Sequence, residues 1–283
     1  MENLYKSSIQ KKIIRSFFNR TCERWDNLYD GTTFINEHMR DRKRIVLESV
    51  EEYAKGRKLK ILDLGCGSGI LTMELLKKGH TVVGADIAGD LISKLNSTLK
   101  THTGIDYLGS VTCDVGATSF AGESFDVILC IGVLQYQLDD NSVLKEITRT
   151  MNRDGICIIT FPNLFKLDFL FDPAYYFKFV FRLIKRFFVF KKTRLSGRFQ
   201  HNYPYDKKYY LGSIRKMISE NALCLIKTAG FGYGPFTFFN RSIFSNRLSI
   251  KISDAIDRLA FMSGINIFNY VSNRWVCVAK KSG

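Results

Sequence analysis

From residue 59 onward, short runs of apolar residues alternate with longer stretches in which apolar residues recur every three or four positions. The short runs predict buried strands, and the longer stretches predict amphipathic helices. Strands are expected at 59–65, 80–86, 124–132 and 154–162, and helices at 69–79, 88–100 and 139–152. Alternation of this kind is typical of a parallel α/β sheet with helices on both faces.

The two ends of the chain complete this pattern. Residues 1–58 predict a helical N-terminal cap, with one helix around 9–18 and a second over 36–54. Late in the chain a helix is expected over 207–222 and strands over 223–231 and 273–281. The expected organisation is a cap at 1–58, a cofactor-binding half at 59–163, an inserted lid at 164–206 and a C-terminal half at 207–283.

The string ILDLGCGSG (61–69) runs from a strand through three alternate glycines into a helix. Gly65 and Gly67 lack side chains, so a ligand can approach the backbone closely, and the start of the helix offers free N–H groups. Asp86 ends the next strand, where a carboxylate can accept hydrogen bonds from ribose hydroxyls. These features predict a site for a small polar ligand that contains a ribose.

Two residues argue against a dinucleotide. The dinucleotide fingerprint GxGxxG requires a glycine where this chain has Ile70. Asp63, two residues before the first glycine, is unfavourable beside a pyrophosphate and suitable beside an ammonium group. The pattern therefore favours a nucleoside that carries an amino acid.

Four strings, DLGCGSG, VVGAD, TCDVGATSF and FDVILCIGVLQY, stand in an order and spacing that resemble the class I S-adenosylmethionine-dependent methyltransferases. The resemblance covers 59–162 well and 207–281 more loosely. It implies a Rossmann-like, seven-stranded, mostly parallel sheet that ends in an antiparallel hairpin. It also implies S-adenosyl-L-methionine as the cofactor.

The resemblance also assigns roles to individual residues. Asp63 would lie near the amino group of the cofactor, the glycine turn around its methionine part, Asp86 at the ribose, and Asp114 with Val115 at the adenine. Ile131 and Gly132 would close the pocket. The implied cofactor-binding set is Asp63, Gly65, Cys66, Gly67, Asp86, Ile87, Asp114, Val115 and Ile131.

The residues directly after the fourth strand bear on the methyl acceptor. Nucleic-acid amino methyltransferases carry an (N/D/S)PP(Y/F) string there, whereas this chain reads IGVLQYQ (131–137). A closer likeness is to quinone-biosynthesis O-methyltransferases, at 197–210 and 230–238, and to magnesium-protoporphyrin O-methyltransferase, at 18–31. These resemblances imply O-methylation of a lipophilic or lipid-linked small molecule. N-methylation, RNA methylation through basic segments, and a non-catalytic cofactor- or membrane-binding module remain as alternatives.

The quinone enzymes have a Glu-His pair where this chain has Gln135 and Tyr136. His201, within the insertion, is a candidate to take the proton from a hydroxyl acceptor, and Tyr136 is a candidate to position that acceptor. The alternative interpretation of His201 is an ordinary surface histidine.

Charge is distributed unevenly along the chain. The formal net charge is +15. Residues 164–210 carry +8, residues 1–20 carry +4 and residues 241–283 carry +5, so the remaining residues, which include the cofactor-binding core, carry only −2. Residues 164–190 also hold eleven aromatic residues. On a helix over 173–190, the residues Lys178, Arg182, Lys185 and Arg186 form one basic stripe. The pattern predicts a lid on the acceptor pocket that faces an anionic membrane, packs on the N-terminal helices, or binds another partner.

Composition limits the remaining possibilities. The hydrophobic fraction of 46% is sufficient for a core, but no apolar run is long enough for a spanning helix and no signal-peptide pattern is present. Seven cysteines without a CxxC pair indicate small buried side chains in a reducing compartment, with no metal site or disulfide. We expect a cytoplasmic protein, peripheral on a membrane if the lid faces lipid; the sequence makes no prediction of oligomeric state.

Overall fold

The computed structural model describes residues 2–100, 107–167, 172–177, 180–181, 204, 206–263 and 267–282. The main sheet has seven strands in the order β3-β2-β1-β4-β5-β9-β6. The strands are β1 Lys60–Leu64, β2 Thr81–Asp86, β3 Tyr107–Thr112, β4 Phe125–Cys130, β5 Met151–Pro162, β6 Leu223–Phe231 and β9 Arg274–Lys281. Strands β1 to β5 are parallel, and β9 is antiparallel to both β5 and β6. The Rossmann-like sheet with a final antiparallel pair is therefore confirmed.

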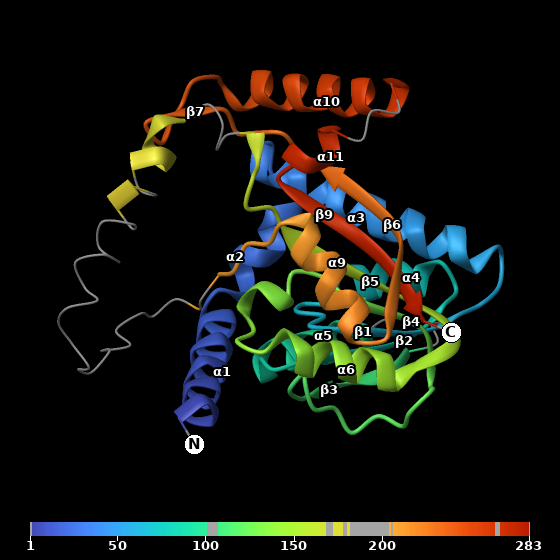
Figure 1. Ribbon diagram of the computed structural model, residues 1–283. Helices are drawn as coiled ribbons and strands as arrows, with labels where there is room; N and C mark the ends of the chain where they lie inside the picture. The colour runs from blue at the N-terminus through green and yellow to red at the C-terminus, as the bar shows by residue number, and fades with distance from the viewer. Residues whose placement is uncertain are drawn as a thin grey trace.

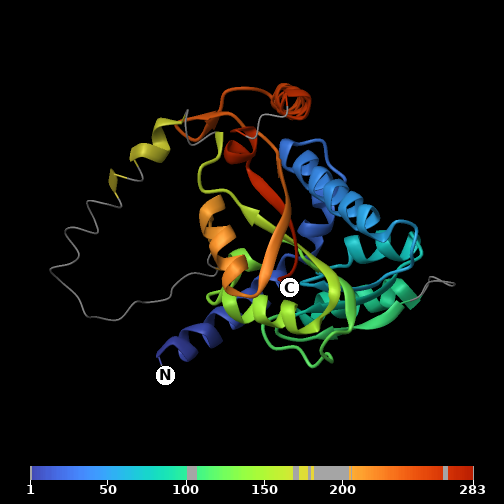
Figure 2. The same ribbon diagram turned by 45° about the vertical axis from the view of Figure 1, so that its right-hand side comes forward.

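The central strands are apolar on both faces because helices cover both sides of the sheet. In β1, Ile61 packs into the core beneath α3, α4 and α5, and Leu62 packs into the core beneath α6 and α9. Figure 2 shows the sheet between these two layers, with α3 and α4 on the right and α9 on the other side. The helices are α3 Phe34–Ala54, α4 Ile70–Lys77, α5 Gly89–Lys100, α6 Asp140–Thr150 and α9 Leu211–Glu220. This is the two-layered cover expected of a doubly wound α/β fold.

The N-terminal cap consists of α1 Glu2–Arg20, α2 Cys22–Asp26, the 3-10 helix η1 Asn27–Tyr29, and α3. In Figure 1, α1 lies at the lower left and α3 runs along the upper right of the sheet. Ile14 of α1 is buried, as the apolar spacing of that helix predicted. The cap thus extends along more than one side of the sheet.

Several element boundaries differ from the prediction, two of them around β5. The helix expected over 139–152 ends at Thr150, and the strand expected over 154–162 begins already at Met151. Helix α9 begins only at Leu211, because Tyr209 pairs with the end of β5: its N–H donates to the carbonyl of Pro162 at 2.9 Å. The residues before α9 are thereby held in an extended conformation.

The structure adds elements that the apolar pattern did not predict. Besides α2, η1 and β3, they are η2 Leu134–Tyr136, the short strands β7 Thr237–Phe238 and β8 Arg241–Ser242, and the helices α10 Asn246–Ser263 and α11 Ile267–Val271. Figure 1 shows α10 across the top of the molecule, above α11 and α3. None of the helices in the described ranges is long and apolar enough to cross a membrane.

The cysteines are all free thiols, and three of them, Cys130, Cys157 and Cys277, are buried as predicted. The prediction is wrong for Cys224, which is exposed. Strand β6 is the edge strand of the sheet, and alternate side chains, beginning with Leu223, pack under α9. Cys224 therefore points to the opposite face of this edge strand, where it meets solvent.

Candidate functional site

One pocket opens at the carboxyl ends of β1, β2 and β4, where ligands bind in open α/β sheets. All nine residues that the sequence assigned to the cofactor line it, and so does Tyr136. His201 lies outside the described residues. Gly132, which was expected to close the pocket with Ile131, lines it too. The pocket is also lined by residues that were not assigned to the cofactor from the sequence: Ile14, Phe18, Trp25, Tyr29, Met39, Arg42, Ser68, Ile70, Leu71, Leu91, Val133, Gln135, Gln137 and Arg274.

The glycine turn after β1 is fastened to the end of β2. The N–H groups of Gly65 and Cys66 donate to the carbonyl of Ala85 at 2.6 and 3.1 Å, and the N–H of Gly67 donates to Oδ2 of Asp86 at 2.9 Å. Asp86 also accepts the N–H of Ala88 at 2.8 Å through Oδ1. The carboxylate of Asp86 therefore holds both the glycine turn after β1 and the loop after β2, and it also lines the pocket.

Gly65 and Gly67 both have positive φ, at 75° and 56°, but they meet different surroundings. A Cβ on Gly65 would lie 2.2 Å from Cγ2 of Val133, whereas a Cβ on Gly67 would meet nothing within 4 Å. Gly65 is thus required by packing of the turn. Gly67 leaves open space against the pocket, which fits a ligand that approaches the backbone there.

Asp63 is a buried carboxylate with only 2% of its surface exposed. Its Oδ2 accepts the hydroxyl of Thr72 at 2.7 Å, and no ion pair reaches it within the described part of the chain. Burial raises the pKa of Asp63 to about 6. A buried carboxylate without a cation is costly, so the site suits a ligand that brings one.

Asp114 also lines the pocket, next to helix α1. It forms an ion pair with Lys11, and Nε of Arg15 donates to the carbonyl of Ile87 at 3.2 Å. Helix α1 therefore covers the part of the pocket around Asp114, where the family resemblance implies that the adenine binds. Val115 is buried beside it and provides an apolar wall.

Aromatic rings line the same pocket, and one of them, Phe18, also comes from helix α1. The ring of Phe18 lies 5.3 Å from Tyr136 and 5.5 Å from Trp25, measured between centroids, and Tyr29 completes the group. Burial raises the pKa of Tyr136, so its phenol is protonated at neutral pH. Tyr136 can therefore donate a hydrogen bond but is not a base.

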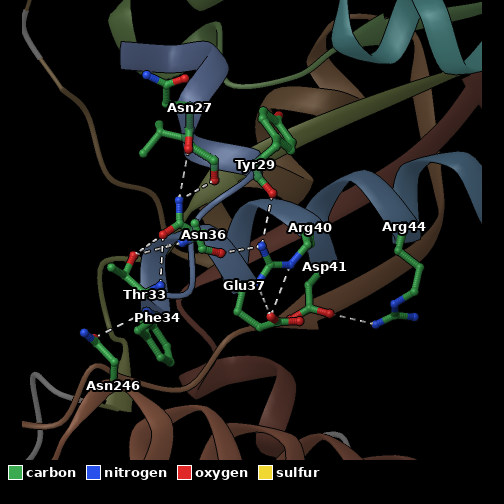
Figure 3. A network of polar contacts seen from close by, with 12 residues as sticks. Asn27, Tyr29, Thr33, Phe34, Asn36, Glu37, Arg40, Asp41, Arg44 and Asn246 are labelled. Carbon is green, nitrogen blue, oxygen red and sulfur yellow. Dashed lines mark hydrogen bonds and ion pairs between the residues drawn. The ribbon is translucent and has the colours of Figure 1, made fainter. Parts of the chain in front are cut away.

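Tyr29 is fixed by the network shown in Figure 3, which ties η1 to the start of α3. Nη1 of Arg40 donates to the carbonyls of Tyr29 and Gly31 at 3.0 and 2.7 Å, and Nδ2 of Asn36 donates to the carbonyl of Leu28 at 2.8 Å. These contacts hold the η1 turn rigidly, so the ring of Tyr29 has a defined position in the pocket.

Two arginines line the pocket beside these aromatic rings. Nη2 of Arg42 donates to the hydroxyl of Tyr29 at 2.7 Å, and a Cβ on Gly132 would lie 3.2 Å from its Nη1. Nη1 of Arg274 donates to Oε1 of Gln135 at 2.9 Å. Both arginines come from segments distant in sequence from the glycine turn, in α3 and β9, and no local motif marks them.

No group of three or more histidine, cysteine, aspartate or glutamate side chains in the described ranges could hold a metal ion. The ionisable groups of the pocket include carboxylates, phenols and guanidinium groups. This set fits a charged organic ligand, with a carboxylate for its cation and a guanidinium for its anion.

Comparison with known families gives one domain match: residues 62–159 match the model described as a methyltransferase domain. This range includes the glycine turn, Asp86 and Ile131. Among curated proteins, the ubiquinone biosynthesis O-methyltransferase of Bartonella tribocorum is 28% identical over 190 residues, which cover 65% of this chain and 68% of that protein.

Solved structures share the fold at low sequence identity. Magnesium protoporphyrin IX methyltransferase from Synechocystis, solved with bound S-adenosylhomocysteine, aligns with a TM-score of 0.58 at 18% identity, over 96% of this chain and 100% of that one. The 1,6-didemethyltoxoflavin-N1-methyltransferase of Burkholderia thailandensis gives 0.60 at 15% identity, over 98% and 91%. Coverage this high extends the likeness beyond the sheet to the N-terminal cap.

Proposed function

We propose that this chain, a class I S-adenosylmethionine-dependent methyltransferase, methylates an oxygen atom on a lipophilic or lipid-linked small molecule. The observation that supports this proposal is a single pocket that is lined both by the cofactor-type residues and by the aromatic rings of Phe18, Trp25, Tyr29 and Tyr136. The likeness to a ubiquinone biosynthesis O-methyltransferase favours oxygen over nitrogen.

S-adenosylmethionine supplies an electrophilic methyl group on its sulfonium sulfur. In our proposal Asp63 binds the ammonium group, Asp86 and Ile87 hold the ribose, and Asp114 with Val115 receives the adenine. Gly65, Cys66 and Gly67 line the methionine part, and Ile131 closes the pocket beside it. Arg42, which lies against Gly132, is placed to bind the cofactor's carboxylate.

The aromatic rings around Tyr136 would exclude water and orient a flat or apolar acceptor. Because the phenol of Tyr136 is protonated, we assign it a positioning role through hydrogen-bond donation. On sequence grounds alone, we assign removal of the acceptor's proton to His201.

We propose further that the acceptor is presented by an anionic membrane. Six apolar side chains form an exposed aromatic patch: Tyr176, Phe177, Phe238, Phe239, Ile243 and Phe244. Figure 1 shows the helical residues 173–177 beside β7. The rings of Phe177 and Phe239 stack at 6.2 Å, and Asp172 accepts the hydroxyl of Thr237 at 2.6 Å, which joins the two segments.

The charge around this patch suits an anionic surface. Residues 236–251 contain three basic residues, Arg241, Arg247 and Lys251, and no acidic residue. The basic stripe expected at Lys178 and its neighbours lies outside the described residues, in the segment after Phe177. Aromatic residues with basic neighbours bind at the interface of anionic bilayers.

The proposed function is tested by incubating the purified protein with methyl-labelled S-adenosylmethionine and an organic-solvent extract of the cells that produce it. We expect label in an ether or ester product that partitions into the organic phase. Label only in amine products would indicate N-methylation. Absence of labelled product, together with undiminished binding of S-adenosylhomocysteine, would indicate a non-catalytic binding protein.

A further inference from the structure

We propose that Arg274 binds an anionic group, a carboxylate or a phosphate, on the methyl acceptor. The inference rests on the proposed function, because it assumes that the aromatic end of the pocket receives the acceptor. It adds a substrate class, since the acceptor then carries a negative charge as well as an apolar body.

The first observation is that Arg274 has no partner of opposite charge among the described residues. It begins β9 and lines the pocket, and its Nη1 donates to the neutral amide of Gln135. Within the ranges that the structure describes, no carboxylate forms an ion pair with it. The negative charge of Asp206 raises the pKa of Arg274, but Asp206 makes no ion pair with it.

The second observation is that a like charge lies nearby. Burial lowers the pKa of Arg274, and the positive charge of Arg42 lowers it further, although a guanidinium remains charged at neutral pH. Nε of Arg42 is itself buried without a hydrogen-bond partner within the described part of the chain. Two guanidinium groups in one partly enclosed pocket are unfavourable unless anions bind there.

S-adenosylmethionine carries one carboxylate, so it can neutralise only one of the two. Of the two arginines, we assign Arg42 to the cofactor's carboxylate, because its Nη1 lies against Gly132, which closes the cofactor site after β4. Arg274 instead contacts Gln135 and acts electrostatically on Tyr136, the residue that we assign to the acceptor. Asp206 acts on Arg274 only at a distance, so we assign the anion that pairs directly with Arg274 to the acceptor.

The form of the site indicates the kind of anion. A guanidinium presents a planar fork of donors that matches the oxygens of a carboxylate or a phosphate. Gln135 holds one Nη1 donor of Arg274, which limits the rotation of the fork. The rings of Phe18, Trp25 and Tyr136 line the same pocket, so an aromatic body attached to the anion would be covered.

We would test this with three aromatic probes of similar size: 2-naphthoate, 2-naphthyl phosphate and the uncharged 2-naphthamide. Binding to the parent protein is measured by calorimetry, with and without saturating S-adenosylhomocysteine. The same titrations are repeated with Arg274→Gln, Arg274→Lys and a matched surface control, Arg153→Gln, whose side chain is exposed. Binding of S-adenosylhomocysteine to each variant shows whether the cofactor half is intact.

We expect the parent to prefer at least one anionic probe to 2-naphthamide by at least about tenfold, the effect of one charge-assisted contact. The stronger of the two anions identifies the group as carboxylate or phosphate. Arg274→Gln should abolish this preference, Arg274→Lys should restore part of it, and Arg153→Gln should leave it unchanged. Affinity for S-adenosylhomocysteine should be the same in all four proteins.

Two results would overturn the inference: equal binding of charged and uncharged probes by the parent, or loss of S-adenosylhomocysteine affinity in Arg274→Gln, which would assign Arg274 to the cofactor. Failure of the proposed function looks different: the parent either does not bind S-adenosylhomocysteine at all, or binds it and transfers no methyl group. In both cases the probe titrations still show whether Arg274 selects an anion.

Discussion

The backbone N–H of Gly67 donates to Oδ2 of Asp86 at 2.9 Å, so the glycine turn after β1 and the end of β2 form one unit. The same carboxylate accepts the N–H of Ala88 through its other oxygen. One side chain therefore shapes the two loops between which a nucleoside would lie.

Replacing Asp86 by alanine should weaken binding of S-adenosylhomocysteine by at least about tenfold, because charge-assisted hydrogen bonds contribute about 1.5–3 kcal/mol each. Calorimetric titration measures the change. Asp90→Ala is the matched control, since Asp90 is exposed in the first turn of α5 and does not line the pocket. Parent-like affinity in Asp86→Ala would remove Asp86 from the cofactor site.

The two glycines of the turn should respond differently to alanine. Gly65→Ala places a methyl group against Val133 and should lower the stability of the whole domain, seen as a lower melting temperature. In Gly67→Ala the added methyl group meets open space. This variant should therefore lose only about 1 kcal/mol of folding stability, the cost of an alanine at positive φ. Gly67→Ala should nevertheless bind S-adenosylhomocysteine poorly. If it binds like the parent, the ligand does not approach the backbone at Gly67.

The raised pKa of Asp63 predicts that the stability of the ligand-free protein depends on pH. Burial raises the pKa of Asp63 from 3.8 to about 6, so the ligand-free protein loses stability as pH rises through that interval. Asp63→Asn should therefore stabilise the ligand-free protein at pH 7 by up to about 3 kcal/mol, and the difference should vanish at pH values below the unfolded pKa. Chemical denaturation at the two pH values tests this.

Binding should show the opposite dependence, because the ammonium group of the ligand requires the ionised carboxylate. Affinity of the parent for S-adenosylhomocysteine should rise as pH increases through about 6, with release of a proton on binding near that pH. Asp63→Asn should bind weakly at every pH. A parent affinity that does not change across this range would mean that Asp63 does not face the cation.

The exposed aromatic patch predicts membrane binding. Exchange of Phe238 and Phe239 for serine should reduce sedimentation with vesicles that contain anionic lipid, because each ring contributes buried apolar area at the interface. Leu108→Ser is the matched control, since Leu108 is similarly exposed on β3, at the other end of the molecule in Figure 1. Equal sedimentation of all variants would show that the patch does not contact lipid.

The sequence predicted the sheet and the cofactor end of the pocket because both depend on local signals. Strands such as β1 are buried on both faces and consist mostly of apolar residues. The glycines of the turn are recognisable in the sequence because their positive φ favours glycine. Strand β3 was not predicted from its pattern, since it is an edge strand whose residues are only partly buried or exposed. Its place in the sheet could be expected only from the family resemblance.

The acceptor part of the pocket could not be predicted in the same way. It is built from three segments that lie far apart in the sequence, α3, η2 and β9. Arg42 stands in the run RDRKR, which is typical of a solvated helix face, and Arg274 precedes an apolar strand. Neither has a local motif, and only the packing of α3 and β9 at one end of the sheet brings both to the pocket. Tyr136 was selected because it comes soon after a recognisable strand.

The most direct test of methyl transfer follows labelled methyl from S-adenosylmethionine into an organic-phase product, with the parent and Asp86→Ala compared at equal concentration. We predict label in the parent reaction and a loss of at least about tenfold in the variant when S-adenosylmethionine is limiting. Equal labelling by both proteins, or none by the parent, would contradict the assignment of this pocket to methyl transfer.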